Sequence, residues 1–149
     1  METLIISSPA FGRGEAIPAR HTCDGSDTSP ALAIAKVPPE ARTLAVIMDD
    51  PDAPSGTWVH WVVWNIPAQT RNIPEGGLPP QAAEGNNSWP RKGYSGPCPP
   101  SGTHRYFFKV YALDTVLHLG PSTGKAVLER AMEGHVLAKG ELMGTYGRR

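Results

Sequence analysis

The chain has 149 residues, 40% of them hydrophobic, and its 14 lysines and arginines balance its 14 aspartates and glutamates, so its net charge is zero. This length fits one domain, residues 1–149, and zero net charge excludes a general attraction to nucleic acid or to acidic membrane surfaces. The sequence contains no run of about 18 apolar residues, so it predicts no membrane span. Its first residues lack the basic segment of an export signal, so we expect a cytoplasmic protein.

Short apolar segments separated by turn residues run through the chain. The 16 glycines and 16 prolines are spread along it, so we expect them to punctuate strands rather than to form a linker. Residues 4–7 and 31–37 are weaker strand candidates. Residues 43–48 (Thr-Leu-Ala-Val-Ile-Met) combine apolar and β-branched side chains and predict a strand that ends before Pro51.

Residues 58–66 form the next predicted strand, in which both alternating sets of side chains are largely apolar. We therefore expect this strand to be covered on both sides. Strict alternation divides the strand into two faces, with Trp58, His60, Val62 and Trp64 on one and Val59, Trp61 and Val63 on the other. Residues 69–94, which follow, have little periodicity and predict a long loop, and loops of that length are often functional.

The last third of the chain combines two strands with one helix. Residues 104–113 are rich in aromatic side chains and predict a third central strand, and residues 137–146 predict a weaker strand. Between them, a helix is predicted to begin near Ser122 or Thr123, which are good N-caps, and to stop at Gly134. Many short strands and one late helix indicate an all-β fold, an antiparallel β-sandwich with a minor helical addition.

The first of two candidate site segments joins the first two predicted central strands. It places Asp50 and Asp52 among prolines and is followed by Trp58 and His60. Asp52 is interpreted as structural, because an aspartate in a proline turn usually bonds the local backbone or a nearby cation such as Arg105. Asp50 either orients a histidine or meets an amine or hydroxyl of a ligand, since a bound anion would repel its carboxylate.

The second segment, residues 96–106, ends in His104 and Tyr106, whose spacing places them on one strand face about 7 Å apart. Its three prolines cannot donate hydrogen bonds, so the N–H of Gly96 is one of the few that an anion could contact. If the two segments meet in space, two histidines, a carboxylate and a tyrosine surround one small polar ligand. An indole such as that of Trp58 could cover a cationic part of this ligand.

Other interpretations stay open at this point. A lone histidine in an apolar strand, such as His60, is more typical of a hydrogen-bonded core residue than of a ligand contact. Asp50, His60 and His104 are also the residue types of a two-histidine, one-carboxylate metal site, so a phosphoester hydrolase or metalloenzyme is the alternative function. No nucleophile motif accompanies these residues, and we predict no catalytic residue, no metal and no cofactor.

The two cysteines, Cys23 and Cys98, are too few for a disulfide framework. Because we expect a reducing cytosol, two packed thiols are favoured. Each cysteine nevertheless lies in a loop rich in turn residues, so the two could be neighbours, and a bridge between them stays an open alternative.

The two candidate segments together resemble the motifs of the phosphatidylethanolamine-binding protein family, in particular its bacterial and archaeal Raf kinase inhibitor-like branch. Further similarities lie in Thr22-Cys23-Asp24-Gly25, in Trp64-Asn65-Ile66-Pro67, in Gly134-His135 and in residues 144–148, so the likeness spans nearly the full chain. The resemblance implies a Greek-key antiparallel β-sandwich with one or two short helices near the C-terminus. It also implies a small non-enzymatic pocket that binds phosphate, carboxylate or phosphoethanolamine-like head groups.

The pocket residues of that family correspond to seven positions of this chain: Asp50, Trp58, His60, Gly96, Pro97, His104 and Tyr106. Eukaryotic relatives bind and inhibit kinases or proteases, so the resemblance implies a kinase or protease as a type of protein partner, and a homodimer is common in the bacterial branch. Residues 86–94 place an aromatic residue and two cations ahead of the second segment, where they are expected to shape the pocket mouth or a partner surface.

Overall fold

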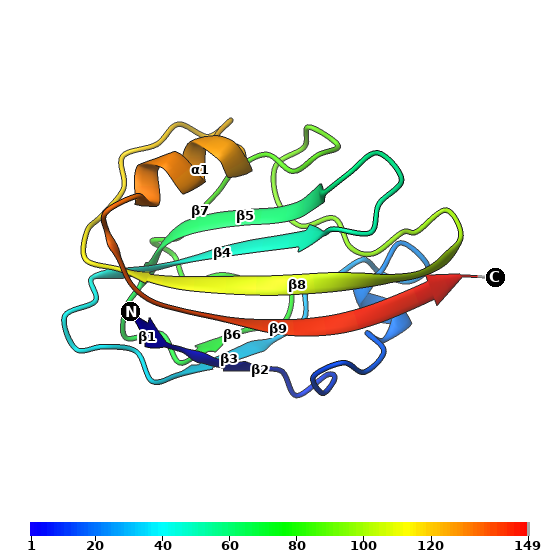
Figure 1. The fold of residues 1–149 in the computed structure, drawn as a ribbon, viewed down its shortest axis with the longest axis horizontal. Helices are drawn as coiled ribbons and strands as arrows, with labels where there is room; N and C mark the ends of the chain where they lie inside the picture. The colour runs from blue at the N-terminus through cyan, green and yellow to red at the C-terminus, as the bar shows by residue number, and fades with distance from the viewer. Residues whose placement is uncertain (149) are drawn as a thin grey trace.

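The computed structural model describes residues 1–148, which form two packed β-sheets and one α-helix (Figure 1). The larger sheet has the strand order β1-β9-β8-β4-β5-β7, with bounds Glu2–Thr3 (β1), Val136–Arg148 (β9), Gly102–Leu113 (β8), Thr43–Asp50 (β4), Trp58–Pro67 (β5) and Ala83–Glu84 (β7). The smaller sheet has the order β2-β3-β6, with bounds Ile5–Ser7 (β2), Leu32–Ala35 (β3) and Asn72–Ile73 (β6). The helices are a 3₁₀ turn, η1 (Ala19–His21), and α1 (Lys125–Met132).

The large sheet is buried on both of its faces in its central strands. Figure 1 shows α1 on one side of it and the small sheet on the other. All eight residues of β4 are buried, and its apolar side chains point alternately into two different cores. Leu44 and Met48 pack against the small sheet, whereas Ala45 and Ile47 pack beneath the helix residue Leu128. The β-sandwich prediction is confirmed.

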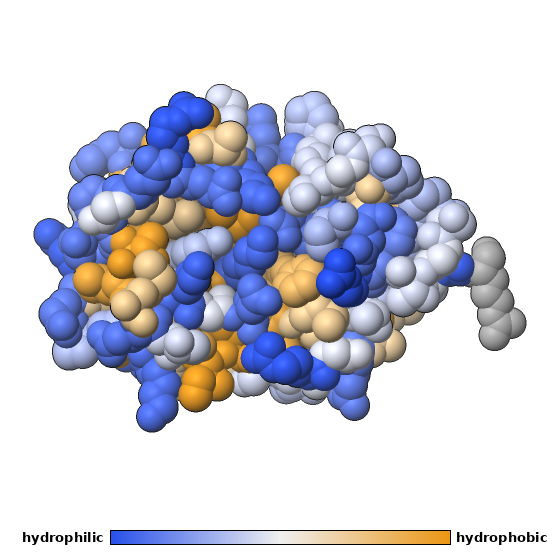
Figure 2. All heavy atoms as spheres, in the orientation of Figure 1, coloured by the Kyte–Doolittle hydropathy of each residue, from blue (hydrophilic) through white to orange (hydrophobic). Residues whose placement is uncertain are grey.

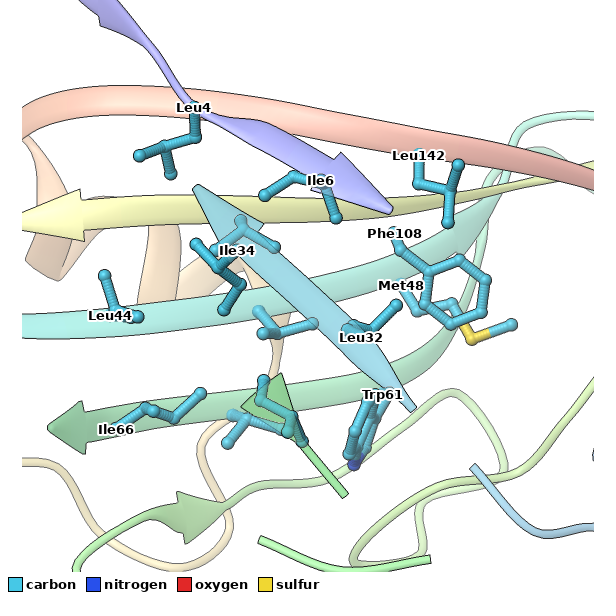
Figure 3. Packing of buried hydrophobic residues seen from close by; sticks show 14 of the residues in the cluster. Leu4, Ile6, Leu32, Ile34, Leu44, Met48, Trp61, Ile66, Phe108 and Leu142 are labelled. Atoms are coloured by element: carbon cyan, nitrogen blue, oxygen red, sulfur yellow. The ribbon is translucent and has the colours of Figure 1, made fainter. Parts of the chain in front are cut away.

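The main core lies between the two sheets. Figure 3 shows side chains of the small sheet interdigitating with those of the large sheet, and the labelled residues come from both: Leu4, Ile6, Leu32, Ile34, Leu44, Met48, Trp61, Ile66, Phe108 and Leu142. Figure 2 shows that hydrophilic residues cover much of the face seen in Figure 1, with apolar residues in separate patches. Within residues 1–148, no helix has the length and apolarity needed to span a bilayer.

Strand crossover brings distant parts of the chain to one end of the large sheet. β4 lies between β5 and β8 and is antiparallel to both, so the end of β4 meets the beginnings of β5 and β8. Asp50 pairs with Trp58 across one ladder, and Asp49 pairs with Phe107 across the other. The two candidate segments, although about forty residues apart, therefore lie side by side.

The predicted division of β5 into two faces is wrong. Met48 pairs with Trp61 and Asp49 pairs with Val59, so His60 is an extra residue in a β-bulge. A bulge re-aims the side chains beside it and breaks the two-residue alternation. Trp58 and His60 point toward the end of the sheet where the pocket lies, whereas Val62 and Trp64 belong to the core beneath α1.

Three further expectations need correction. The predicted loop over residues 69–94 contains the two short strands β6 and β7. The N-cap of α1 is Gly124, because the hydroxyl of Thr123 donates to the carbonyl of Gly120 (2.7 Å) instead of capping the helix. β1 pairs with β9 in parallel, an exception in a sheet whose other pairings are antiparallel among the described residues.

The expectation of two separate thiols is also wrong, since Cys23 and Cys98 form a disulfide. The fold brings their loops together, as the backbone N–H of Cys23 donates to the carbonyl of Pro97 (3.1 Å). Sequence composition cannot reveal this neighbourhood, because 75 residues separate the two cysteines along the chain. The bridge ties the loop after η1 to the loop that leads into β8.

Candidate functional site

A cavity of about 260 Å³ opens at the end of the large sheet where β4, β5 and β8 meet. Twelve residues from both candidate segments and from the loop before β8 line it: Asp50, Ala53, Pro54, Ser55, Trp58, His60, Trp89, Cys98, Pro99, Pro100, His104 and Tyr106. Ligand pockets usually hold about 300–1,000 Å³, so this one suits a small molecule or a head group. The predicted convergence of the two segments is confirmed.

His104 and Asp50 form a buried pair in the cavity wall. Nδ1 of His104 donates to Oδ2 of Asp50 at 2.7 Å, with side-chain exposures of 10% and 4%. The other carboxylate oxygen of Asp50 accepts the backbone N–H of Asp52 at 2.7 Å. Of the two roles that the sequence left open for Asp50, the structure shows that it orients a histidine. Because Nδ1 is bound to Asp50, Nε2 is the ring nitrogen of His104 that can contact a ligand.

His60 is held in a similar way by the backbone. Its Nδ1 donates to the carbonyl of Ser95 at 2.6 Å, and the residue is only 2% exposed. Burial lowers the pKa of His60 below its usual value of 6.5, against the raising effect of the Ser95 carbonyl and of Asp50. The ring is therefore neutral at neutral pH, and its Nε2 is an acceptor rather than a cationic donor.

Tyr106 forms the floor between the two histidines. Its ring lies 5.3 Å from that of His60, edge to face, and 6.4 Å from that of His104, nearly parallel to it. The second distance confirms the expected spacing on one strand face. Burial raises the pKa of Tyr106 well above its usual value of 10, so its hydroxyl stays protonated and can donate.

Two indoles form the mouth of the cavity. Trp58 and Trp89 lie 5.5 Å apart in a T-shaped contact, and Trp89 also packs edge-on against His60 at 5.0 Å. Asn87 positions Trp89, because its side-chain oxygen accepts the N–H groups of Trp89 (3.0 Å) and Arg91 (3.2 Å). Trp89 was not among the predicted site residues, although the loop over residues 86–94, which contains it, was expected to shape the pocket mouth or a partner surface.

Gly96 and Pro97 lie behind the cavity wall rather than in it. The N–H of Gly96, expected as an anion contact, donates to Oδ1 of Asp27 at 2.8 Å. A Cβ at Gly96 would lie only 2.1 Å from the carbonyl oxygen of His21, so only glycine lets the backbones of these two residues lie this close together. Both residues anchor the loop, while the next residues, Cys98 to Pro100, form the wall.

Asp52 has the structural role that the sequence predicted. Its carboxylate accepts two side-chain hydrogen bonds from Arg105, each 2.9 Å long, and the backbone N–H of the same residue. These bonds lower the pKa of Asp52 to about 2. The pair fixes the 51–55 turn against the start of β8, which holds Asp50 beside His104.

The metal-site alternative finds no geometric support. Among residues 1–148, no group of three or more histidine, cysteine, aspartate or glutamate side chains is arranged to hold a metal ion. The Nδ1 atoms of His60 and His104 are both engaged by other oxygens. What the cavity offers instead is a hydroxyl donor, an aromatic mouth and two ring nitrogens, the Nε2 atoms of His60 and His104, that no hydrogen bond within residues 1–148 occupies.

The chain is similar to known proteins along nearly its whole length. A family model described as "Phosphatidylethanolamine-binding protein" matches residues 7–147. A UPF0098 protein of Methanothermobacter thermautotrophicus is 51% identical over 96% of this chain and 98% of its own length. The UPF0098 protein PH1269 of Pyrococcus horikoshii is 49% identical over 95% of this chain and 76% of its own length.

Two crystal structures share the fold closely. A phosphatidylethanolamine-binding protein homologue, CT736 of Chlamydia trachomatis, superposes with a TM-score of 0.94, is 40% identical and is matched over 100% of both chains. YbcL of E. coli, described as a new member of the mammalian PEBP family, superposes with a TM-score of 0.92 and is 31% identical, over 98% of this chain and 99% of its own.

Proposed function

The chain belongs to the phosphatidylethanolamine-binding protein family, and on this premise we propose that its pocket binds one small phosphate- or carboxylate-bearing ligand without transforming it. The observation that supports this most is the way both histidines are held. Each uses Nδ1 for an internal oxygen, which leaves Nε2 for the cavity that both residues line. A preorganised set of polar groups in a small concave site is the usual design of a ligand pocket.

The anion would lie against His104 and Tyr106. Tyr106 offers a hydroxyl that stays protonated, and His104 offers Nε2, because its Nδ1 is bound to Asp50. Asp50 itself is shielded from the anion, because one of its oxygens faces His104 and the other faces a backbone N–H. His60 is neutral, so its Nε2 would accept a proton donor of the ligand, such as a phosphate hydroxyl or an amine.

The aromatic mouth suits the opposite end of a zwitterionic ligand. Trp58 and Trp89 line the opening, and the face of an indole attracts an ammonium group by about 0.5–2 kcal/mol. Phosphoethanolamine, with one phosphate and one ammonium, would use both halves of the cavity. Inorganic phosphate would use the inner half alone.

Isothermal titration calorimetry with inorganic phosphate tests the proposal. We expect His104→Ala to weaken binding by about 1–3 kcal/mol, the range for losing a charge-assisted hydrogen bond. His118→Ala is the matched control, since His118 is exposed and does not line the cavity. Equal affinities of His104→Ala and the parent protein would refute the assignment.

The Asp50–His104 pair also supports a second candidate function, a phosphoester hydrolase. A histidine oriented by a buried carboxylate is the arrangement of a general base, and its free Nε2 could activate water. Turnover of p-nitrophenyl phosphate that disappears in His104→Ala but survives in His118→Ala would establish this activity. Binding without turnover, in protein whose metal content has been measured, would leave the binding function.

A further inference from the structure

The disulfide between Cys23 and Cys98 forms part of the pocket. Cys98 lines the cavity, and Cys23 is exposed to solvent on the other side of the bridge. Cys98 stands between Pro97 and Pro99 in the loop that contributes part of the cavity wall. A covalent bond in the wall of a binding site is thus within reach of an external thiol.

Little else secures this part of the wall. The backbone anchors of the loop, at Gly96 and Pro97, precede Cys98, and the ladder with β9 begins only at Gly102. Between them, within the part of the chain that the structure describes, residues 98–101 make no backbone hydrogen bond. The disulfide is therefore the covalent restraint, beside the packing of the buried Pro99, on the segment that carries three of the cavity-lining residues.

A cation lies at the sulfur that faces the pocket. Nη1 of Arg148 is 3.7 Å from Sγ of Cys98, and its Nη2 donates to Asp24 at 2.9 Å. Asp24 also accepts the hydroxyl of Tyr146 at 2.6 Å, so the end of β9 is docked against the bridge. A neighbouring guanidinium stabilises a thiolate, which makes Cys98 the better leaving group when the bond is attacked.

We propose that the Cys23–Cys98 disulfide is a redox-modifiable site whose reduction by a dithiol weakens anion binding in the adjacent pocket. This inference rests on the proposed binding function. A thiolate of the reductant attacks Sγ of Cys23, the S–S bond breaks, and Cys98 leaves as a thiolate beside Arg148. The second thiol of the reductant then displaces Cys23 from the mixed disulfide, so two cysteines are reduced while the dithiol is oxidised to its disulfide.

Reduction acts on the pocket in two ways. Residues 98–101 lose their covalent restraint, so ordering them around a ligand costs conformational entropy. Reduction also leaves the sulfur of Cys98 free in the wall, where its thiolate form would repel a bound anion. Both effects lower affinity for an anion and neither requires the sandwich core to change.

The bond itself can be tested without any ligand. The folded protein is equilibrated with graded ratios of reduced and oxidised dithiothreitol, its free thiols are alkylated, and the products are weighed by mass spectrometry. We expect reversible interconversion with an unchanged far-ultraviolet circular dichroism spectrum, and faster amide hydrogen exchange in the reduced form where the loop enters β8, over residues 102–106, at the start of the ladder with β9. A bond that opens only on global unfolding, or unchanged exchange in that segment, would overturn the inference.

Calorimetry with inorganic phosphate then measures the consequence for binding. Reduced protein and Cys23→Ser, which leaves the Cys98 thiol in the wall, should bind phosphate at least about fivefold more weakly than oxidised protein, as a loosened wall and a like charge both oppose the anion. Cys98→Ser removes the bridge and the charge together, so its affinity should lie between the two. Equal phosphate affinity in oxidised and reduced protein would overturn the inference.

The two proposals fail separately. If oxidised protein binds no phosphate, the proposed function fails, and the exchange measurement alone decides whether the disulfide controls the order of the pocket wall. If oxidised and reduced protein bind phosphate equally, the binding function stands and the redox inference fails. His118→Ala serves as the control in both redox states, since it should behave like the parent protein throughout.

Discussion

At the residue scale, the ligand groups that the pocket can bind depend on which ring nitrogens of its histidines carry protons. His60 bonds a carbonyl and is neutral because it is buried, whereas His104 bonds a carboxylate. The sequence predicted both histidines in one site but treated them alike, as anion contacts. Their difference depends on the oxygen that each Nδ1 meets, and those oxygens come from Ser95 and Asp50, which no local sequence pattern connects to the rings.

The depressed pKa of His60 predicts how stability changes with pH. The unfolded chain binds a proton at His60 as the pH falls through 6.5, whereas the folded state does not until a lower pH, so stability falls on acidification below 6.5. His60→Asn removes this titration. The gap in unfolding free energy between parent and variant, measured by urea denaturation from pH 8 to 5, should therefore shrink as the pH falls. A gap that is constant or widens toward pH 5 would contradict the assignment.

Trp89 should discriminate between ligands. Its indole lies at the mouth, where the ammonium end of phosphoethanolamine would rest, while inorganic phosphate has no cationic end. We expect Trp89→Ala to weaken phosphoethanolamine binding by about 0.5–2 kcal/mol and phosphate binding much less. Titration of both ligands into the parent and the variant checks this. An equal loss for both would mean that Trp89 acts only by closing the cavity.

At the element scale, the loop over residues 86–93 decides the shape of the pocket mouth. Asn87 is 5% exposed, and its amide group donates to the carbonyl of Gly93 and to the hydroxyl of Ser95 while its oxygen accepts two backbone N–H groups. The Asn87 side chain thus holds the loop together with little strand pairing, which is limited to an isolated bridge between Asn86 and Lys92. This explains why the sequence indicated only a long functional loop: one buried asparagine has no periodic signature.

Asn87→Ala should destabilise both the loop and the protein. Several buried polar groups lose their partner, and each such loss costs about 1–3 kcal/mol. We expect the unfolding free energy to fall by at least about 1–3 kcal/mol, the cost of one such group, and phosphoethanolamine binding to weaken because Trp89 is no longer positioned. The neighbouring Asn86→Ala is the control, since no hydrogen bond of the Asn86 side chain occurs within the described chain. Similar losses in both variants would contradict this role for Asn87.

Strand prediction succeeded where apolar runs are long and failed where pairing is irregular. The three central strands were predicted from β-branched and aromatic residues, and the structure confirms all three as β4, β5 and β8. The face assignment within β5 failed because a bulge depends on the register with β4, which a single strand's pattern does not contain. The two-residue strands β6 and β7 are too short to produce any periodicity.

At the scale of the whole molecule, the larger of the two cores lies between the sheets and contributes strongly to stability. Phe108 on β8 is fully buried there and contacts Phe11 at a ring distance of 5.9 Å. We expect Phe108→Ala to lower the unfolding free energy by about 3–5 kcal/mol. Phe107→Ala, on the opposite face beneath Arg105 and Lys109, should cost clearly less. Urea denaturation of both variants measures the contrast, and equal losses would contradict the two-sided architecture.

The convergence of the two proline-rich segments could be predicted in outline because the sequence resembles a known family, and the structure shows its physical cause in the crossover from β5 to β8. The disulfide shows the limit of prediction from composition, since the neighbourhood of Cys23 and Cys98 is a property of the folded chain.

The cytoplasmic location, the homodimer and the kinase or protease partner stay predictions. Native mass spectrometry of freshly purified protein would report the number of subunits and any bound ligand.

A crystal structure of the oxidised protein with phosphate tests the binding site most directly. We predict phosphate in the cavity between β4, β5 and β8, with one oxygen within hydrogen-bond distance of Nε2 of His104 and another within reach of the Tyr106 hydroxyl. Phosphate bound elsewhere on the molecule, or within the cavity but away from both groups, would contradict this binding site.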